Sequence, residues 1–214
     1  MLNLAVFVSG RGSNLSAILN NINAGNLNAR VLIVISDKNE CKAFEICEKE
    51  NIEKFVLSSK IEESNSVPYN DLTKILLDRK IDLIVLAGFL KKIPSSLINI
   101  YKNKIINIHP ALLPAFGGKG MYGINVHKAV FETSAKISGA TVHFVDEVYD
   151  NGKIIDQRVV DISNVSSPEE IAGKVLKIEH ELLSYVIQKF AEEKIKIIDN
   201  RVIIDRNWIW RKKL

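Results

Sequence analysis

The sequence predicts an α/β protein with a doubly wound, mostly parallel sheet of Rossmann-like type and antiparallel strands at its edge. Three patterns lead to this fold class. Continuous apolar runs alternate with segments of helical apolar spacing, which is typical of strands buried on both faces of a parallel sheet. The first run leads directly into a glycine-containing loop and a helix. Near residues 138–161 apolar and polar residues alternate, which predicts an antiparallel hairpin.

The first strand, predicted at 4–8, is followed by the loop 9–14 and by a helix that begins near Leu15. Such a loop leaves backbone N–H groups free at a helix N-terminus, where the helix dipole favours an anion. The residues predicted to contact a phosphate group are Gly12, Ser13 and Asn14. The alternative is a tight turn that only caps the helix. The loop is neither a dinucleotide fingerprint nor a P-loop, because Leu15 replaces the third glycine and no Gly-Lys-Ser/Thr follows.

The other elements follow in order along the chain. In the first half, strands are predicted at 31–35, 55–57, 81–87 and 104–108, with helices around 43–47, 69–78 and 97–101 and an irregular segment at 58–68. In the second half, helices at 125–132 and 168–191 flank strands at 138–145 and 154–161, and a hairpin joins 195–198 to 202–204. Trp208 and Trp210 are predicted to cover edges of the sheet or core.

Asn107 and His109 stand at the end of the 104–108 strand, and Pro110 and Pro114 prevent a central strand or helix from continuing. The two side chains are two residues apart, so both point to the same face while Ile108 points to the core. The amide can donate to a developing oxyanion, and the imidazole can exchange a proton near neutral pH. This pair suits acyl transfer. The alternative is a loop pair that hydrogen-bonds the backbone.

The loops after the first, fourth and fifth strands should open on one edge of the sheet, because ligands bind at the carboxyl ends of parallel strands. One cleft is therefore predicted, beside a mobile glycine-rich loop at 117–123. The acidic turn 146–152 could bring a carboxylate to His109 and raise its pKa, although a solvated turn is the alternative. His127 is predicted to pack or cap, His143 to be a hydrogen-bonded sheet residue, and Glu179 to lie on a charged helix face.

Composition excludes several classes of protein. The net charge of +4 is spread along the chain, so nucleic-acid binding is not indicated, whereas a small anionic ligand is compatible with it. Cys41 and Cys47 suit free thiols in a reducing compartment, and neither a signal peptide nor a membrane span is recognisable, so a cytoplasmic location is expected. No metal-ligand cluster and no activated nucleophile stand out. We expect one domain, 1–214, either monomeric or homodimeric.

Four segments together resemble the phosphoribosylglycinamide formyltransferases of purine biosynthesis, a family of folate-dependent enzymes. These segments are SGRGSNL, LAGFLKKIP, NIHPALLP and GATVHFVDEVYDNGKII, and the resemblance extends over nearly the whole chain. It implies transfer of a formyl group from 10-formyltetrahydrofolate to the amino group of glycinamide ribonucleotide, by direct amine attack and without a metal.

The resemblance also assigns roles to matching positions. Gly12, Ser13, Asn14 and Glu179 match contacts to the ribonucleotide. The positions that match the folate wall are Leu90, Lys91, Lys92, Ile93, Asn107, Asp146 and Asp150. Asn107, His109 and Asp150 match the catalytic residues, with Asp150 keeping His109 charged.

The sequence departs from the family in two places. The 116–126 stretch is longer than in many members and has Asn125 where some carry a histidine, and 58–68 lacks an arginine that some relatives place near the folate. Three alternative functions fit the sequence less well. A methionyl-tRNA formyltransferase is expected to have a further C-terminal domain, and a formyltetrahydrofolate hydrolase an additional N-terminal one. A non-catalytic folate-binding module would not need Asn107, His109 and Asp150.

Overall fold

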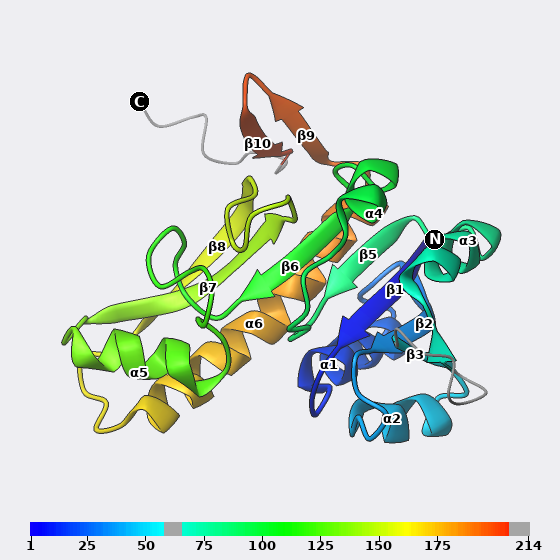
Figure 1. Ribbon diagram of the computed structural model, residues 1–214. Coiled ribbons are helices and arrows are strands. Elements are labelled where there is room, and N and C mark those ends of the chain that lie inside the picture. The colour runs from blue at the N-terminus through cyan, green and yellow to red at the C-terminus, as the bar shows by residue number, and fades with distance from the viewer. Residues whose placement is uncertain (58–65, 206–214) are drawn as a thin grey trace.

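A computed structural model describes residues 1–57 and 66–205 (Figure 1). Eight strands form one sheet in the order β4-β3-β2-β1-β5-β6-β7-β8. Their bounds are β1 Leu2–Val8, β2 Ala29–Ser36, β3 Glu53–Leu57, β4 Ser66–Val67, β5 Leu83–Leu86, β6 Ile105–His109, β7 Ile137–Phe144 and β8 Ile154–Asp161. A second sheet pairs β9, Ile195–Ile198, with β10, Arg201–Ile204. The predicted positions of Trp208 and Trp210 lie outside the described residues.

The strand order confirms the doubly wound fold class. From β1 the chain moves outward through β2, β3 and β4, and β5 then returns to the other side of β1. All pairs from β4 to β6 are parallel, and β7 and β8 add antiparallel pairs at one edge. The order reverses between β1 and β5, so the crevice for a ligand opens at the carboxyl ends of these strands. The strand β4 was not predicted, because its two residues are too few for a sequence pattern.

Helices cover both faces of the sheet (Figure 1). Their bounds are α1 Ser13–Asn23, α2 Ala43–Lys49, α3 Tyr69–Asp78, α4 Ser95–Ile100, α5 Ile124–Glu132 and α6 Pro168–Ala191. The side chains of β1 alternate between two cores: Leu4, Val6 and Val8 face the core shared with α1, α2 and α6, and Ala5 and Phe7 face the core shared with α3 and α4. This alternation explains the continuous apolar run, since both faces of β1 are buried.

The helix α6 is the longest element and packs against α1, α5, β7 and β8. It begins at Ser167, whose side chain accepts a hydrogen bond from the backbone N–H of Glu170 as an N-cap. Its buried stripe runs along the sheet and passes beside the start of α1 (Figure 1). The helix therefore joins the first and last thirds of the chain at the crevice.

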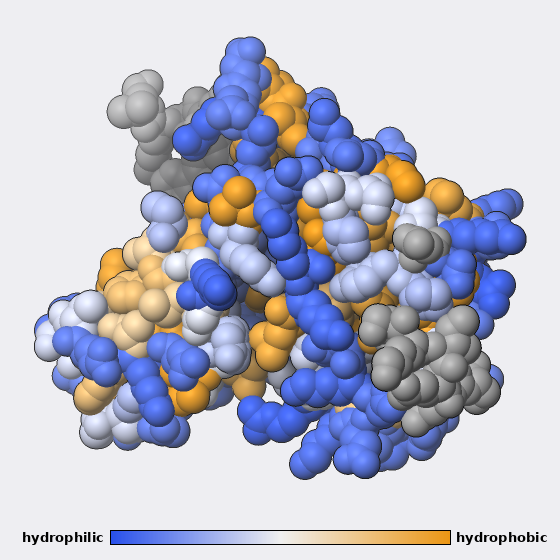
Figure 2. Space-filling view, in the orientation of Figure 1, coloured by the Kyte–Doolittle hydropathy of each residue, from blue (hydrophilic) through white to orange (hydrophobic). Residues whose placement is uncertain are grey.

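The surface in Figure 2 is hydrophilic over most of the face shown, and its hydrophobic area is gathered in a few patches. One patch lies on the β9–β10 hairpin, where Ile197, Ile198 and Ile203 are exposed. Within the described residues, no helix has both the length and the apolar character needed to cross a membrane.

Candidate active site

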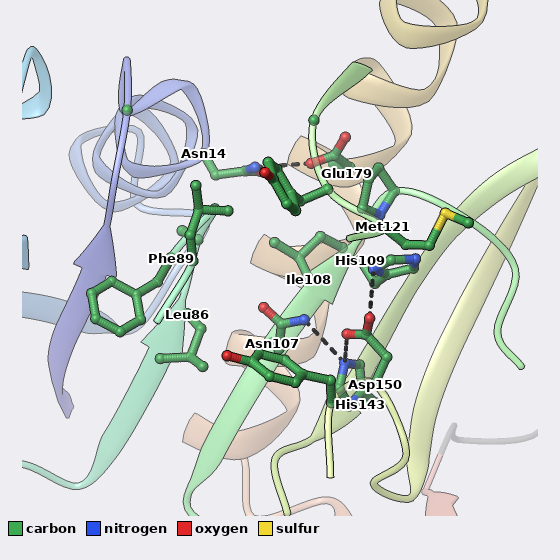
Figure 3. A pocket seen from close by; sticks show the side chains of 18 of the residues that line it. Asn14, Leu86, Phe89, Asn107, Ile108, His109, Met121, His143, Asp150 and Glu179 are labelled. Atoms are coloured by element: carbon green, nitrogen blue, oxygen red, sulfur yellow. Dashed lines mark hydrogen bonds and ion pairs between the residues drawn. The ribbon is translucent and has the colours of Figure 1, made fainter. Parts of the chain in front are cut away.

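A cavity of about 790 Å³ lies at the carboxyl ends of β1, β5 and β6. Its walls come from the loop after β1, the loop after β5, the end of β6, the 118–124 loop, the 146–150 turn and one stripe of α6 (Figure 3). The loops predicted to converge on one cleft therefore do so. Every residue predicted for the site lines this cavity: Gly12, Ser13, Asn14, Leu90, Lys91, Lys92, Ile93, Asn107, His109, Asp146, Asp150 and Glu179.

The first wall is the loop that begins α1. Gly12 is the N-cap residue and has a left-handed backbone with φ of 77°, a conformation that glycine adopts without strain. No side chain caps this helix, so its first N–H groups are available to an anion at the cavity. A Cβ on Gly12 would lie 2.7 Å from the Cβ of Ala43 in α2, which shows how closely α2 supports the loop from behind.

Asn14 and Glu179 form a buried polar pair across the cavity wall (Figure 3). The Asn14 Nδ2 atom donates to Glu179 Oε2 at 3.0 Å, and Asn14 Oδ1 is buried without a hydrogen-bond partner in the structure. Burial raises the pKa of Glu179, although the bond from Asn14 works in the opposite direction. The pair thus presents polar groups to the cavity from two distant parts of the chain.

The prediction that Glu179 lies on a charged helix face was wrong, because only 9% of this residue is exposed. Its position explains the burial. Glu179 is four residues after Val175 and three before Leu182, and all three lie on the buried stripe of α6. A carboxylate at helical spacing within an apolar stripe was therefore the signal in the sequence.

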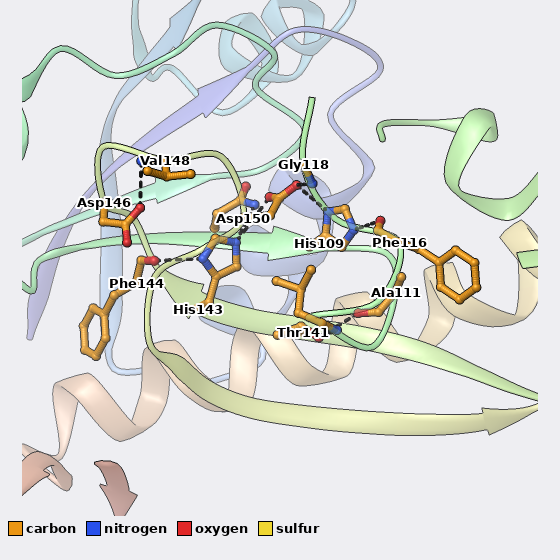
Figure 4. Close-up of polar contacts among 12 residues, drawn as sticks. His109, Ala111, Phe116, Gly118, Thr141, His143, Phe144, Asp146, Val148 and Asp150 are labelled. Carbon is orange, nitrogen blue, oxygen red and sulfur yellow. Dashed lines mark hydrogen bonds and ion pairs between the residues drawn. The ribbon is translucent and has the colours of Figure 1, made fainter. Parts of the chain in front are cut away.

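The second wall holds Asn107 and the two histidines of neighbouring strands. Asn107 in β6 is the register partner of His143 in β7, and Asn107 Nδ2 lies 3.0 Å from His143 Nε2. His143 Nδ1 lies 2.8 Å from the carbonyl oxygen of Phe144, which can only accept (Figure 4). This places the proton of His143 on Nδ1, so Nε2 accepts from the Asn107 amide. One N–H of Asn107 is used here, and the second remains for the cavity.

Asp150 lies between the rings of His109 and His143 (Figure 4). Its Oδ2 atom is 3.6 Å from His109 Nδ1 and accepts from the backbone N–H of Gly118 at 2.8 Å, while Oδ1 is 3.6 Å from His143 Nε2. His143 Nε2 cannot both accept from Asn107 and donate to Asp150. We assign the bond to Asn107, because 3.0 Å is within hydrogen-bond range and 3.6 Å is beyond it.

Electrostatics hold Asp150 ionised. Burial alone would raise the pKa of its carboxyl, but the His109 ring and the hydrogen bond from the N–H of Gly118 act in the opposite direction, and this pKa is lowered. The Asp150 backbone is left-handed, with φ of 54°, a conformation that aspartate adopts more readily than most residues. The turn therefore directs a negative charge at the two imidazole rings.

A carboxylate does reach His109, since Asp150 Oδ2 lies 3.6 Å from its Nδ1, and this charge raises the His109 pKa as predicted, but the effect of burial is larger. Burial lowers this pKa below its ordinary value, and the opposing effects of Asp150 and the Phe116 carbonyl do not restore it. His109 is only 3% exposed, and a charge is costly there. Its Nε2 donates to the Phe116 carbonyl at 2.8 Å, so both ring nitrogens face an acceptor.

His143 is a hydrogen-bonded residue of the sheet and His127 is packed, as predicted, but the sequence did not indicate that both would lie at the cavity. Both line the cavity, and each is 5% exposed or less. The pattern that could have identified His143 was its alternation with Thr141, which places it opposite Asn107 once β6 and β7 pair. His127 packs inside α5 as predicted, and burial and the nearby His109 lower its pKa to about 4.

The third wall is more exposed. Leu90, Lys91 and Lys92 are exposed at the mouth of the cavity, whereas Ile93 is buried. Leu90 is held by its N–H, which donates to Ser9 Oγ at 3.0 Å, and Asp146 Oδ1 accepts from Val148 N–H across the turn. Within the described residues, no group of three His, Cys, Asp or Glu side chains is arranged to hold a metal ion.

Comparison with known proteins agrees with this geometry. The family described as formyl transferase matches residues 2–187. A chloroplastic phosphoribosylglycinamide formyltransferase of Arabidopsis thaliana is 42% identical over 95% of this chain, and the Bacillus subtilis phosphoribosylglycinamide formyltransferase is 35% identical over 88% of it. The crystal structure of the Anaplasma phagocytophilum phosphoribosylglycinamide formyltransferase superposes with a TM-score of 0.85, at 30% identity, and covers 97% of this chain and 95% of its own.

The chain covers 94% of the Bacillus relative, but only 62% to 70% of the length of the plant relatives it matches. The family match nonetheless extends over most of the chain and includes every wall of the cavity. The chain therefore belongs to the formyl transferase family.

Proposed function

We propose that this protein transfers the formyl group of 10-formyltetrahydrofolate to the amino group of glycinamide ribonucleotide, as a phosphoribosylglycinamide formyltransferase of purine biosynthesis. The observation that carries the proposal is the meeting of Asn107, His109 and Asp150 in a cavity whose opposite wall is the uncapped start of α1. One wall has groups for acyl transfer and the other has groups for a phosphate. Relatives named for this activity align over most of the chain.

The two substrates would occupy different walls. The ribonucleotide phosphate would bind the N–H groups at Gly12, Ser13 and Asn14, where the helix dipole favours an anion. Glu179, held by Asn14, would accept hydrogen bonds from the ribose hydroxyls. The folate would lie between the 90–93 loop and the 146–150 turn, which supply the apolar and backbone surface that a flat ring needs.

In the reaction, the substrate amine attacks the formyl carbon, and a carbon–nitrogen bond forms while the formyl oxygen becomes an oxyanion. The free N–H of Asn107 and the ring of His109 would stabilise this oxyanion. The tetrahedral centre then breaks its bond to folate N10. The amine nitrogen loses one proton and N10 gains one, so tetrahydrofolate leaves and no covalent enzyme intermediate forms.

His109 must give up one contact to take part. Its Nε2–H donates to the Phe116 carbonyl, and its Nδ1 faces Asp150. We infer that the oxyanion replaces the Phe116 carbonyl as the acceptor for Nε2. A negative oxygen in place of a neutral carbonyl would raise the His109 pKa, so the charged ring would form in the complex although burial disfavours it in the free protein.

The test measures absorbance of the folate product with purified protein, 10-formyltetrahydrofolate and glycinamide ribonucleotide. Wild-type protein should release tetrahydrofolate only when the ribonucleotide is present, and His109→Ala should abolish the release. Release without ribonucleotide would identify a hydrolase instead. Folate binding without any release would identify a binding module and contradict the transferase proposal.

The proposal extends to the domain organisation, the ligands and the cellular location of the protein. One formyltransferase domain, 1–214, would bind the two small molecules and no nucleic acid. A cytoplasmic location stays a prediction, since the plant relatives are named as chloroplastic. Fractionation of the source cells, followed by immunoblotting, would test it.

A further inference from the structure

Residues 206–214 hold the excess positive charge of the chain. This segment contains Arg206, Arg211, Lys212 and Lys213 and no acidic residue, whereas the whole chain contains 29 Lys and Arg and 25 Asp and Glu. The first 205 residues therefore contain 25 residues of each sign. The cations are spread along the chain, but their excess over the acidic residues lies entirely in this segment.

The same segment holds both tryptophans of the sequence. Trp208 and Trp210 stand next to the cations, and Ile209 and Leu214 are two further large apolar residues. Tryptophan is favoured at a boundary between lipid and water, because its ring is apolar and its N–H is polar. Cations beside such residues are attracted to anionic lipid headgroups. The composition of the segment therefore suits an anionic lipid surface.

The β9–β10 hairpin, which leads into this segment, has an outer face of similar composition. Ile198 lies opposite Arg201, and Ile203 lies opposite Lys196, so these four side chains share one face of the hairpin. All four are exposed, Ile198 at 49% and Ile203 at 46%. The opposite face, which includes Val202, packs against the main core. Two exposed isoleucines beside two cations therefore point away from the protein.

The hairpin lies where a bound surface would leave the cavity open. Figure 1 shows β9 and β10 at the opposite end of the sheet from the arrowheads of β1, β5 and β6, and the cavity lies at those arrowheads. The described residues that line the cavity all come from other elements. The N–H of Asp205 donates to the Lys194 carbonyl at 2.8 Å, so the segment 206–214 starts at the base of the hairpin.

We propose that residues 206–214 and the outer face of the β9–β10 hairpin dock this protein on an anionic phospholipid surface, without crossing the bilayer. Trp208 and Trp210 would enter the headgroup region, and the cations would face the lipid phosphates. A nucleic acid would also attract the cations and stack on the tryptophans, but the exposed isoleucines favour the apolar boundary of a bilayer. The inference is independent of the proposed reaction, because it uses no residue of the cavity.

The first test is flotation of the full chain with vesicles of phosphatidylcholine and phosphatidylglycerol in equal parts, beside vesicles of phosphatidylcholine alone. The protein should float only with the anionic vesicles, and added salt should release it by screening the charges. Lys212→Glu/Lys213→Glu should weaken binding about 25-fold or more, since each cation near an anionic surface contributes about fivefold. Lys42→Glu/Lys49→Glu is the matched control, because it changes the net charge equally at two exposed lysines at the ends of α2.

The second test uses tryptophan fluorescence, which reports on residues 206–214 alone because both tryptophans lie there. Anionic vesicles should shift the emission to shorter wavelength as Trp208 and Trp210 leave water, and phosphatidylcholine vesicles should not. An emission maximum that is already at short wavelength and that vesicles do not change would show that the protein itself covers the tryptophans. That result would overturn the proposal.

The third test examines the hairpin. Ile198→Ser/Ile203→Ser should weaken flotation with anionic vesicles, because two apolar side chains no longer reach the bilayer. Leu77→Ser/Ile137→Ser is the control, since these residues of α3 and β7 are 54% and 56% exposed. Thermal melts show whether each variant is folded. Equal effects of the two double variants would exclude the hairpin from the contact.

Three further outcomes would overturn the proposal. The protein could fail to float with the anionic vesicles at low salt. The charge reversal at Lys212 and Lys213 could weaken binding no more than the reversal at α2, which would assign the attraction to total charge. Binding to a DNA duplex but not to vesicles, measured by fluorescence anisotropy of labelled DNA, would identify a nucleic-acid contact instead.

Discussion

Asn14 Nδ2 donates to Glu179 Oε2 at 3.0 Å, although the two residues are 165 positions apart in the chain. The bond joins the first turn of α1 to the middle of α6, at the edge of the cavity. The carboxylate is buried and its pKa is raised, and Asn14 Oδ1 has no hydrogen-bond partner in the structure. Such a group costs stability, which indicates that it is kept for binding rather than for folding.

Replacing Glu179 by Gln should stabilise the fold and weaken ribonucleotide binding. The amide keeps an oxygen for Asn14 Nδ2 and adds an N–H that can reach Asn14 Oδ1. We expect the free energy of unfolding to rise by about 1 kcal/mol, as for one gained buried hydrogen bond. The KM for glycinamide ribonucleotide should rise about tenfold, since a neutral amide binds hydroxyls less strongly than a carboxylate.

Denaturant melts and steady-state kinetics measure the two effects. Glu181→Gln is the matched control, because Glu181 is the exposed glutamate two positions along the same helix and should change neither quantity. A Glu179→Gln protein that is both less stable and fully active would contradict the assignment of this pair to the substrate wall.

The sequence predicted the sheet well because local patterns encode it. The buried residues of β1 are all apolar, and so are Ile33, Val34 and Ile35 of β2, because both faces of these strands are covered. β8 is the last strand of the large sheet and is more exposed than they are. The turn residues 150–152 also indicated where the hairpin reverses. These features depend on neighbours in the chain, and a single sequence displays them.

The rest depended on packing between distant segments. Glu179 is brought to Asn14 only because α6 packs beside α1, and His143 reaches Asn107 only because β7 pairs with β6 in one register. The His109 pKa could not be predicted either. The sequence showed the favourable partner, Asp150, but the burial that outweighs it is a property of the assembled core.

Asp150→Asn should move the titration of His109 to lower pH. The Asp150 charge raises the His109 pKa, so its removal leaves burial with less opposition. Asparagine also adopts the left-handed backbone found at this position, so the turn should keep its shape. NMR titration of the His109 ring protons, assigned by comparison with His109→Ala, measures the shift. An unchanged or raised pKa would show that Asp150 does not act on this ring.

Asn107→Ala should lower kcat by about 10²- to 10³-fold, as removal of one oxyanion donor does in other acyl-transfer sites. The KM for the ribonucleotide should change little, because Asn107 lies on the wall opposite the α1 loop. Stopped-flow or steady-state release of tetrahydrofolate gives both constants. Asn99→Ala, an exposed asparagine of α4, is the control. A rise in KM at constant kcat would instead assign Asn107 to substrate binding.

His127 should make the fold less stable in acid. Its pKa is about 4 in the folded protein and near 6.5 when unfolded, so between these values the unfolded chain binds more protons. The stability that neutral His127 contributes is complete above pH 6.5 and is lost as the pH falls towards 4. The loss can reach about 3 kcal/mol, because each pKa unit corresponds to about 1.4 kcal/mol.

Urea melts from pH 8 to pH 4 test this effect with His127→Leu, which cannot titrate. The difference in unfolding free energy between variant and wild type should shift in favour of the variant as the pH falls. At pH 8 the two proteins differ only by packing, which provides the reference. Parallel pH curves would mean that another group takes up the proton.

Gly12→Ala should be far more damaging than Gly10→Ala, although the two glycines lie in the same loop. Gly12 has φ of 77°, and an added Cβ would lie 2.7 Å from the Ala43 Cβ, whereas a Cβ on Gly10 would have nothing within 4 Å. The left-handed backbone alone costs about 1–2 kcal/mol with a side chain, and the contact with α2 adds to this cost. Thermal melts of the two variants should show this difference in stability directly.

The affinity for the ribonucleotide should also fall with Gly12→Ala, even under conditions where the variant is folded, because the α1 N–H groups that face the phosphate are displaced. Equal effects of the two substitutions would show that neither the backbone conformation of Gly12 nor its contact with Ala43 shapes this loop.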